Sequence, residues 1–478
     1  MIFTSFEFIL FFAVVVLVRN CLRNFSAEKW FLVAASCAFY MSWSVPCVLL
    51  VLFTSMMDYS IGRKINQTTL ADARKRLLLM SLVFNLGMLA FFKYGNFFLE
   101  NLSAIFNVVG WRVGSLHYDI ILPPAISFFT FASMGYVLDV YYERIPVCES
   151  ARDYTLFITF FPKLLSGPIT RAGEFLPQLK ERVRASAEDV EIGLSYFMMG
   201  AVKKLVIAEQ VAPHVNLIFS APTQYDGLTL LMGGLGYTVQ IYCDFAGYSD
   251  MAIGCARMLG YRLPENFQMP YSSRNITEFW RRWHITLSKW FRDYAFLPLE
   301  LATRNNPYPT LRVSINIIVM MLLVGLWHGP SWNFVIFGGI HGLALAIHKI
   351  WTVWKPLARL KDRPVYLGMW TLCSHLLTLG VVLFAFIVFR AQSFSEATDY
   401  LTRLLSWTHS GIRLNSPYLP AAIVAVLVTH LLVRKDRNLA LELPQMSMAR
   451  RIVGYTALLL LLVLLAATDA SPFIYFKF

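Results

Sequence analysis

The chain has 478 residues, of which 57% are hydrophobic and 15% are charged. Soluble proteins average about 45–50% apolar and roughly 25% charged residues, so this composition excludes an ordinary water-soluble domain. The net charge of +13 could suggest a nucleic-acid binder, but the cationic residues lie in short segments between apolar stretches, as the positive-inside rule describes. We therefore predict an all-α polytopic integral membrane protein that contacts membrane lipids and no nucleic acid.

Apolar stretches recur from the first residues to the last. Crossing a bilayer takes roughly 17–25 apolar residues, and the stretches that approach this length include 3–18, 77–92, 367–389 and 452–467. The first stretch has no basic segment before it and no small-residue cleavage site after it, which favours a retained anchor over a cleaved signal peptide. We expect about 11–12 transmembrane helices in a single membrane domain, 1–478.

The charge of the connecting segments predicts their side of the membrane. Segments 63–76 and 257–312 are rich in Lys and Arg and should be cytoplasmic, whereas 100–118 and 213–227 are nearly free of them and should face the periplasm. Segment 157–169 is too short to cross and contains two prolines and a glycine, so we predict a re-entrant or interfacial segment. No internal repeat is visible, which weakens a transporter interpretation.

The segment 257–310 is too long for a simple connection, and long loops of this kind are usually functional. Within it, Asn275 stands three residues before Glu278, which is the spacing of a capping box and predicts a helix from about Ile276 to Tyr294. Aromatic residues fall on one arc of this helix and cationic residues on the other. The pattern predicts an amphipathic helix in the cytoplasmic interface, with its tryptophans at headgroup depth.

Two residues of this helix bear on chemistry. Arg281 and Arg282 could form a basic wall for an anionic acyl donor as well as contact anionic lipid. His284 lies at the edge of the apolar arc.

Polar residues also occur inside the apolar stretches. His328 ends one stretch, directly before the helix-breaking residues Gly329 and Pro330, and an ionisable group at membrane depth is a functional candidate. A neutral imidazole there could act as a general base, although a structural role is compatible with the same position. Asp244 interrupts another apolar segment, and a structural hydrogen-bond cluster is the alternative to a functional site.

Two further histidines, His341 and His348, are seven residues apart on one apolar segment. No Cys, Asp or Glu joins them at ligand spacing, so we expect packing or hydrogen-bonding roles and no metal.

Three segments in this order resemble the bacterial alginate O-acetyltransferase branch of the membrane-bound O-acyltransferase family. They read QIYCDFAGYSDMAIG, LPENFQMPYSSRNITEFWRRWHITLSKWFRDY and LWHGPSWNFVIFGGIHG, and the opening and closing residues look similar too. The resemblance covers nearly the whole chain. It implies a helical bundle around a central funnel, which the acyl donor enters from the cytoplasm and the acceptor from the other side. The family's catalytic histidine falls on His328, and a second family position falls on His284.

The resemblance also implies an activity. Such proteins take an acetyl group from a cytoplasmic donor, here acetyl-CoA as substrate with no bound cofactor, for O-acetylation of an extracytoplasmic polysaccharide. A periplasmic partner of the SGNH-hydrolase type and the polysaccharide-synthesis machinery are the implied partners. With His328 and His284 as catalytic residues, we expect the substrate-binding residues to be Trp327, Trp283, Arg281, Arg282, Asp244 and Asn333.

Two other functions stay open from the sequence. The first is transfer of D-alanine or another acyl group from a carrier protein to a cell-envelope polymer, since the same residue types would serve that reaction. The second is export of a polysaccharide or lipid without acyl chemistry.

Overall fold

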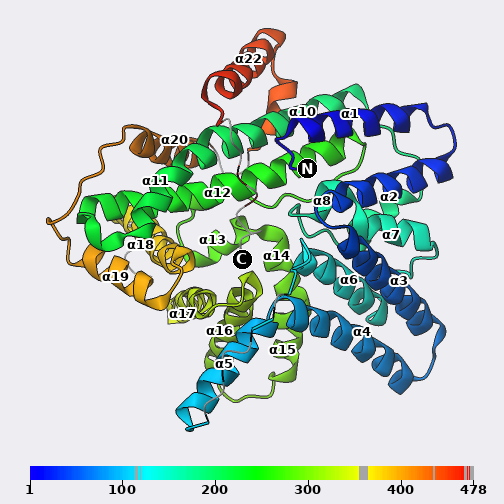
Figure 1. Cartoon of the computed structure of the whole chain (residues 1–478), viewed down its shortest axis with the longest axis horizontal. Coiled ribbons are helices and arrows are strands. Elements are labelled where there is room, and N and C mark those ends of the chain that lie inside the picture. The colour runs from blue at the N-terminus through cyan, green and yellow to red at the C-terminus, as the bar shows by residue number, and fades with distance from the viewer. Residues whose placement is uncertain are drawn as a thin grey trace. The chain divides into compact units, whose positions relative to one another are not determined.

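The computed structural model describes residues 1–111, 114, 117, 118, 120–354, 364–433, 437–467, 471 and 473. These residues form helices and loops, and within them no β-strand forms beyond one isolated bridge between Tyr225 and Ile412 (Figure 1). The prediction of an all-α protein is therefore confirmed. The chain forms two compact units, one of residues 1–197 with 248–264 and the other of residues 198–247 with 265–478. A single membrane domain stays a prediction.

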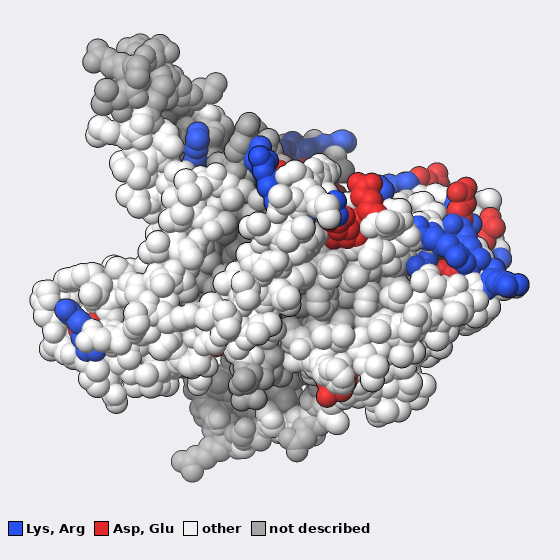
Figure 2. Space-filling view, turned by 90° about the horizontal axis from the view of Figure 1, so that it is seen from above, with Lys and Arg blue, Asp and Glu red and all other residues white. Residues whose placement is uncertain are grey.

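Six described helices are long and apolar enough to cross a membrane. They are α3 (Val45–Gln67), α4 (Ala71–Phe92), α16 (Pro309–His328), α17 (Trp332–Trp354), the Gly368–Arg390 part of α18 (Pro364–Arg390) and α22 (Met448–Leu465). Two shorter apolar helices are α6 (Ile126–Tyr141) and α20 (Tyr418–Leu432). Charged side chains on the face in Figure 2 gather in a few patches, and wide areas between the patches show none. The protein is thus a multi-pass membrane protein, while the total of 11–12 crossings stays a prediction.

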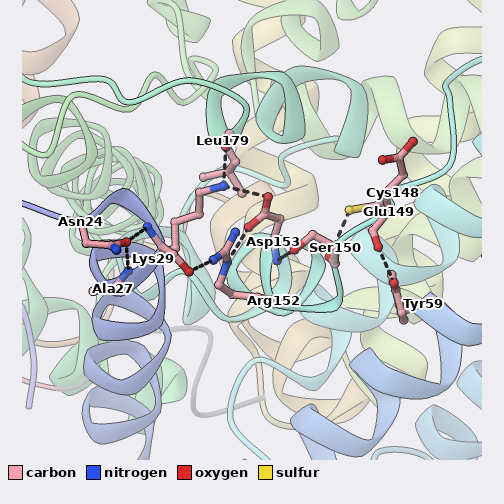
Figure 3. Close-up of polar contacts among 11 residues, drawn as sticks. Asn24, Ala27, Lys29, Tyr59, Cys148, Glu149, Ser150, Arg152, Asp153 and Leu179 are labelled. Carbon is pink, nitrogen blue, oxygen red and sulfur yellow. Dashed lines mark hydrogen bonds and ion pairs between the residues drawn. The ribbon is translucent and has the colours of Figure 1, made fainter.

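Buried ion pairs hold the first unit together. Lys29 of α2 (Phe25–Met41) donates hydrogen bonds to Asp153 Oδ2 at 2.9 Å and to the carbonyl of Leu179 at 2.7 Å (Figure 3). Asp153 lies in the first turn of α7 (Ala151–Thr159), so this contact joins two helices that are far apart in sequence. The remaining helices of the unit are α1 (Phe6–Cys21), α5 (Gly95–Val108), α8 (Phe161–Leu164), α9 (Ala172–Phe175) and the start of α10 (Ala187–Ala201).

The segment predicted to be re-entrant or interfacial consists of short pieces. The end of α7 and the four residues of α8 cover its first half, and neither helix is long enough to cross a bilayer. Every residue from 157 to 169 is buried in the protein. Irregular backbone is tolerated in such a place because protein surrounds it.

The second unit is organised around a helical hairpin of α16 and α17, which lie side by side (Figure 1). Two glycines allow the close approach: a Cβ on Gly325 would lie 2.1 Å from the carbonyl oxygen of Phe334, and a Cβ on Gly338 would lie 2.2 Å from that of Met321. Small residues let membrane helices pack backbone to backbone in this way. The other helices are α11 (Glu209–Ser220), α12 (Gly227–Met258, which continues into the first unit), α13 (Ile276–Arg282), α14 (Ile285–Phe291), α15 (Leu297–Ala302), α19 (Phe394–Leu405) and α21 (Leu439–Glu442).

Candidate active site

The helix predicted from Ile276 to Tyr294 is interrupted at His284. Asn275 caps α13 as expected, because its side-chain oxygen accepts a hydrogen bond from the Glu278 amide at 2.8 Å. The helix then ends at Arg282, and His284 takes a left-handed conformation with φ of 42° before α14 begins. A non-glycine residue in this region is uncommon, and such strain clusters at functional sites. The prediction of one continuous amphipathic helix was therefore wrong.

The tryptophans of this segment face protein and not lipid headgroups. Trp280, Trp283 and Trp290 are all at least 92% buried. Trp283 packs on the rings of Phe267 and Phe386, with centroids 5.1 and 5.2 Å away. The apolar arc is therefore part of the core of the second unit, while the depth of these tryptophans in the membrane stays a prediction.

One loop residue fixes the backbone and ring of His284. The side-chain oxygen of Asn266 lies 3.2 Å from His284 Nδ1 and accepts hydrogen bonds from the amide and hydroxyl of Thr286 at 3.3 and 2.9 Å. Because an amide oxygen only accepts, Nδ1 carries the proton and Nε2 keeps its lone pair. Nε2 has no hydrogen-bond partner among the described residues. His284 lies outside the six candidate spans, and complete burial lowers its pKa to about 3, so the ring is neutral at physiological pH.

His328 is the last residue of α16 and is 2% exposed. The helix ends there because Gly329 has an extended backbone and the chain turns directly into α17. Its imidazole is surrounded by aromatic rings, with Phe337 of α17 and Phe389 of α18 at centroid distances of 5.6 and 5.3 Å. The helix end thus holds a titratable ring in a pocket that excludes bulk water.

Trp327 brings the two histidines into one cluster. Its ring centroid lies 5.1 Å from that of His328 and 5.8 Å from that of His284. Phe245 of α12 closes the other side of His284 at 4.7 Å. Residues that are 44 positions apart in the sequence therefore flank the same indole ring, as the prediction of a shared site requires.

A polar cavity of about 540 Å³ lies next to this cluster, within the second unit. Phe389, which contacts His328, is part of its wall. The polar residues around it come from distant parts of the chain: Lys204, Glu209, Asn216, Gln240, Asp244, Ser331, Asn333, Arg390, Gln392 and Ser471. A cavity of this size with convergent polar groups is typical of a small-molecule site.

A buried ion-pair network forms one side of the cavity. Lys204 Nζ lies 2.5 Å from Asp244 Oδ1 and 2.6 Å from Glu209 Oε1, and all three side chains are at least 94% buried. Lys204 belongs to a π-helical segment, Val202–Ala208, between α10 and α11, and such segments are frequent at functional sites. Glu209 also accepts hydrogen bonds from the amide and hydroxyl of Ser471 at 3.1 and 2.8 Å.

The residues predicted to bind substrate do not all lie in one place in the structure. Asp244 and Asn333 line the cavity, where Asn333 donates a hydrogen bond to the carbonyl of Ala391 at 2.8 Å. Arg281 is exposed, and Arg282 forms an ion pair with Glu278 at 3.1 Å on the same helix. Neither arginine lines the cavity, so the predicted contact of these arginines with the acyl donor would lie outside the cavity.

The other two histidines that the sequence analysis considered contact residues of α13. His341 is buried and accepts a hydrogen bond from Trp280 Nε1 at 3.3 Å. His348 Nδ1 lies 2.9 Å from the Thr277 hydroxyl. Both contacts join α17 to α13.

The sequence analysis missed Lys204, Glu209 and Arg390. A signal was present for the first two, because Lys203, Lys204 and Glu209 interrupt an apolar stretch, VKKLVIAE. Arg390 gave no comparable signal, because an arginine at the end of an apolar helix is also typical of a residue at the membrane boundary.

Comparison with known proteins decides the family. Residues 144–389 match the model of MBOAT, the membrane-bound O-acyltransferase family, and this range contains Asp244, His284 and His328. The chain belongs to this family. As a membrane-bound O-acyltransferase it is an enzyme, and the prediction made from the three sequence segments is confirmed.

Individual relatives agree with this assignment. The chain is 36% identical to the probable alginate O-acetylase AlgI of Azotobacter vinelandii, over 90% of this chain and 83% of the relative. It is 35% identical to the peptidoglycan O-acetyltransferase of Helicobacter pylori, over 79% of this chain and 74% of the relative. The teichoic acid D-alanyltransferase of Streptococcus thermophilus is 29% identical over 55% of this O-acyltransferase and 67% of its own length.

Proposed function

We propose that this membrane-bound O-acyltransferase moves an acetyl group from a cytoplasmic thioester donor, acetyl-CoA, across the bacterial inner membrane for O-acetylation of an extracytoplasmic polysaccharide. The observation that carries the proposal is the cluster of His284 and His328 around Trp327, beside a polar cavity. The names of the alginate and peptidoglycan relatives support a polysaccharide as the final acceptor. A periplasmic partner of the SGNH-hydrolase type would complete the transfer to polymer.

His328 acts as the general base in this proposal. Its imidazole takes the proton of an acceptor hydroxyl while that oxygen attacks the thioester carbonyl carbon. The carbon–sulfur bond then breaks, the new ester carries the acetyl group, and the imidazolium returns its proton to the leaving thiolate. A positioned base typically contributes about 10² to 10⁴ in rate. The surrounding aromatic rings exclude water, which would otherwise hydrolyse the thioester.

His284 assists in a different way. With Nδ1 held by Asn266, its Nε2 is fixed in position next to Trp327. We assign it the orientation of donor or acceptor, a role that does not require it to take up a proton. Asp244 and Asn333 would contact the acceptor from the cavity wall, and Trp327 and Trp283 would hold the reacting groups from the aromatic side.

The test is the variant His328→Ala, assayed in membranes with labelled acetyl-CoA. We expect normal insertion and a loss of acetyl transfer to background. The matched control is His409→Ala, which removes an exposed histidine of the same unit and should leave transfer unchanged. Full transfer by well-expressed His328→Ala protein would refute the assignment. Labelling from a D-alanyl carrier protein in place of acetyl-CoA would favour the D-alanyl transferase alternative, and the relatives of that name motivate the comparison.

A further inference from the structure

The first unit contains a buried carboxyl group at membrane depth. Asp58 lies on α3, which is long and apolar enough to cross a membrane, and its side chain is completely buried. Within the part of the chain that the structure describes, its hydrogen-bond partners are all neutral: Ser81 Oγ at 2.6 Å, Asn85 Nδ2 at 2.8 Å and Ser133 Oγ at 2.5 Å. Ionisable groups at membrane depth are normally paired, and they mark ion sites and other functional positions.

Oxygen atoms from four helices surround this carboxyl group. Ser81 belongs to α4 and Ser133 to α6, and the Ser133 hydroxyl lies 2.9 Å from the Tyr154 hydroxyl of α7. Carboxylate, hydroxyl and carbonyl oxygens are the ligands that hard cations prefer. A hydroxyl group can turn its hydrogen away and present a lone pair to an ion. The cluster therefore places ligands of one chemical type around a single negative charge.

Two further oxygen atoms of the cluster have no hydrogen-bond partner. Ser55 lies about one helical turn before Asp58, on the same face of α3. Asn85 donates to Asp58 through Nδ2, which leaves its Oδ1 as an acceptor. Both side chains are completely buried, and neither Ser55 Oγ nor Asn85 Oδ1 has a partner among the described residues. A buried polar atom without a partner is costly, so these two oxygens indicate a ligand.

The number of oxygens favours a metal ion over a proton. A proton on Asp58 would add a single hydrogen bond, so at least one of the two unpartnered oxygens would stay without a partner. A metal ion can take lone pairs from both of them and from the serine hydroxyls as well. One carboxylate balances one positive charge, which favours a monovalent ion. The hydrogen-bonded oxygens of the cluster lie only 2.5–2.9 Å apart, and this close spacing favours sodium over the larger potassium ion.

Polar groups continue from the cluster to a loop at the end of α6. The rings of Tyr154 and Tyr59 lie side by side, with centroids 6.0 Å apart, and the Tyr59 hydroxyl donates to the carbonyl of Glu149 at 2.7 Å (Figure 3). Glu143 in the same loop forms an ion pair with Arg74 at 2.7 Å. Arg74 belongs to the basic segment 63–76, which is predicted to be cytoplasmic. An ion would therefore reach the cluster from the cytoplasm.

We propose that this cluster is a binding site for a sodium ion. Its ligands are Ser55, Asp58, Ser81, Asn85 and Ser133. The ion joins α3, α4 and α6, and it stabilises the first unit because it binds the folded state and not the unfolded chain. The proposal is independent of the proposed function, since every ligand belongs to the first unit and both histidines belong to the second.

The test uses the purified full-length protein in a non-ionic detergent. Thermal unfolding is measured at constant ionic strength in NaCl, KCl or choline chloride, and binding of radioactive sodium is measured in parallel. We expect saturating sodium to raise the Tm by about 3 °C or more relative to choline, as for a ligand well above its Kd. Potassium should raise the Tm less than sodium does.

Two variants, each with a matched control, assign the effect to the cluster. Asp58→Asn keeps the size of the side chain but removes its charge, so the sodium-dependent shift and the bound sodium should both be lost. Ser55→Ala removes an unpartnered oxygen and breaks no hydrogen bond, so it should fold normally without sodium yet bind sodium about tenfold more weakly. The controls Asp72→Asn and Ser60→Ala change exposed residues of α4 and α3 and should behave like the wild type.

Several outcomes would overturn the proposal. Equal Tm values of the wild type in sodium and choline, with no bound sodium, would do so. An equal shift in sodium and potassium would show a general salt effect, and a full sodium-dependent shift in both Asp58→Asn and Ser55→Ala would place the ion elsewhere. A wild-type Tm that ignores sodium but changes with pH, in a way that Asp58→Asn abolishes, would make Asp58 a proton site.

Discussion

Replacing Gly338 by alanine tests whether the close packing of α16 and α17 positions His328, the proposed general base. The new Cβ would lie 2.2 Å from the carbonyl oxygen of Met321, closer than real Cβ atoms approach a neighbour. The two helices must therefore move apart by most of an ångström. Alanine is the better helix former by about 0.8–1.0 kcal/mol, but overpacking a tight interface typically costs about 1–3 kcal/mol. We expect a net destabilisation of up to about 2 kcal/mol.

The neighbouring residue supplies a matched control. A Cβ on Gly339 would meet only Leu322 Cδ2, at an ordinary contact distance of 3.6 Å. Gly339→Ala should therefore gain stability from the higher helix propensity of alanine, with no clash against α16. The variant should be at least as stable as the wild type.

The assays are thermal unfolding in detergent micelles and acetyl transfer in membranes. Because His328 is the last residue of α16, separation of the helices should lower the transfer rate of Gly338→Ala and leave Gly339→Ala active. Equal stability and activity of the two variants would refute the reasoning.

Three further predictions concern other parts of the chain. Burial lowers the pKa of His284 to about 3, below the ordinary value of about 6.5 in the unfolded chain, so the folded state should lose stability as the pH falls from 6.5 toward 3. Thermal unfolding measured at pH 7 and pH 5 should therefore show a smaller loss of stability for His284→Gln than for the wild type. Lys29→Met removes one of the two cations that pair with Asp153 and leaves Arg152, so it should cost about 1.5–3 kcal/mol in unfolding free energy. Lys64→Met, at an exposed position, should change the unfolding free energy little, and equal effects of the two variants would argue against a structural ion pair. In a protein whose native cysteines are replaced, a cysteine at position 415 should react with an impermeant label added from outside, and a cysteine at position 75 should not. The reverse pattern would invert the predicted topology.

The sequence alone determined that the protein belongs in a membrane and which family it belongs to, and it singled out His284 and His328 as candidate site residues. Long apolar stretches with few charges require a lipid environment, so the all-α multi-pass architecture follows from composition. The segment around His284 and the segment around His328 are specific enough to indicate an O-acyltransferase. The site of the helix start at Asn275 also followed from local chemistry, because an N-cap depends only on neighbouring residues.

The break at His284 was decided by tertiary structure. Periodicity favours one helix from Ile276 to Tyr294, since aromatic and cationic residues alternate at helical spacing throughout. The loop residue Asn266 overrides this preference, because its side chain satisfies Thr286 and contacts His284, and its carbonyl accepts the Ile285 amide at 2.9 Å. No local pattern could show that a residue about 20 positions away would supply these hydrogen bonds.

The cavity, too, exists only in the folded chain. Its charged residues lie between positions 204 and 390, and each one read separately is compatible with a residue at a membrane boundary or in a structural ion pair. Their arrangement in space distinguishes them: Lys204 is neutralised by Glu209 and Asp244, whereas Arg390 contacts only neutral groups of the described chain. Charge balance is a property of neighbours in space, and packing alone decides which residues become neighbours.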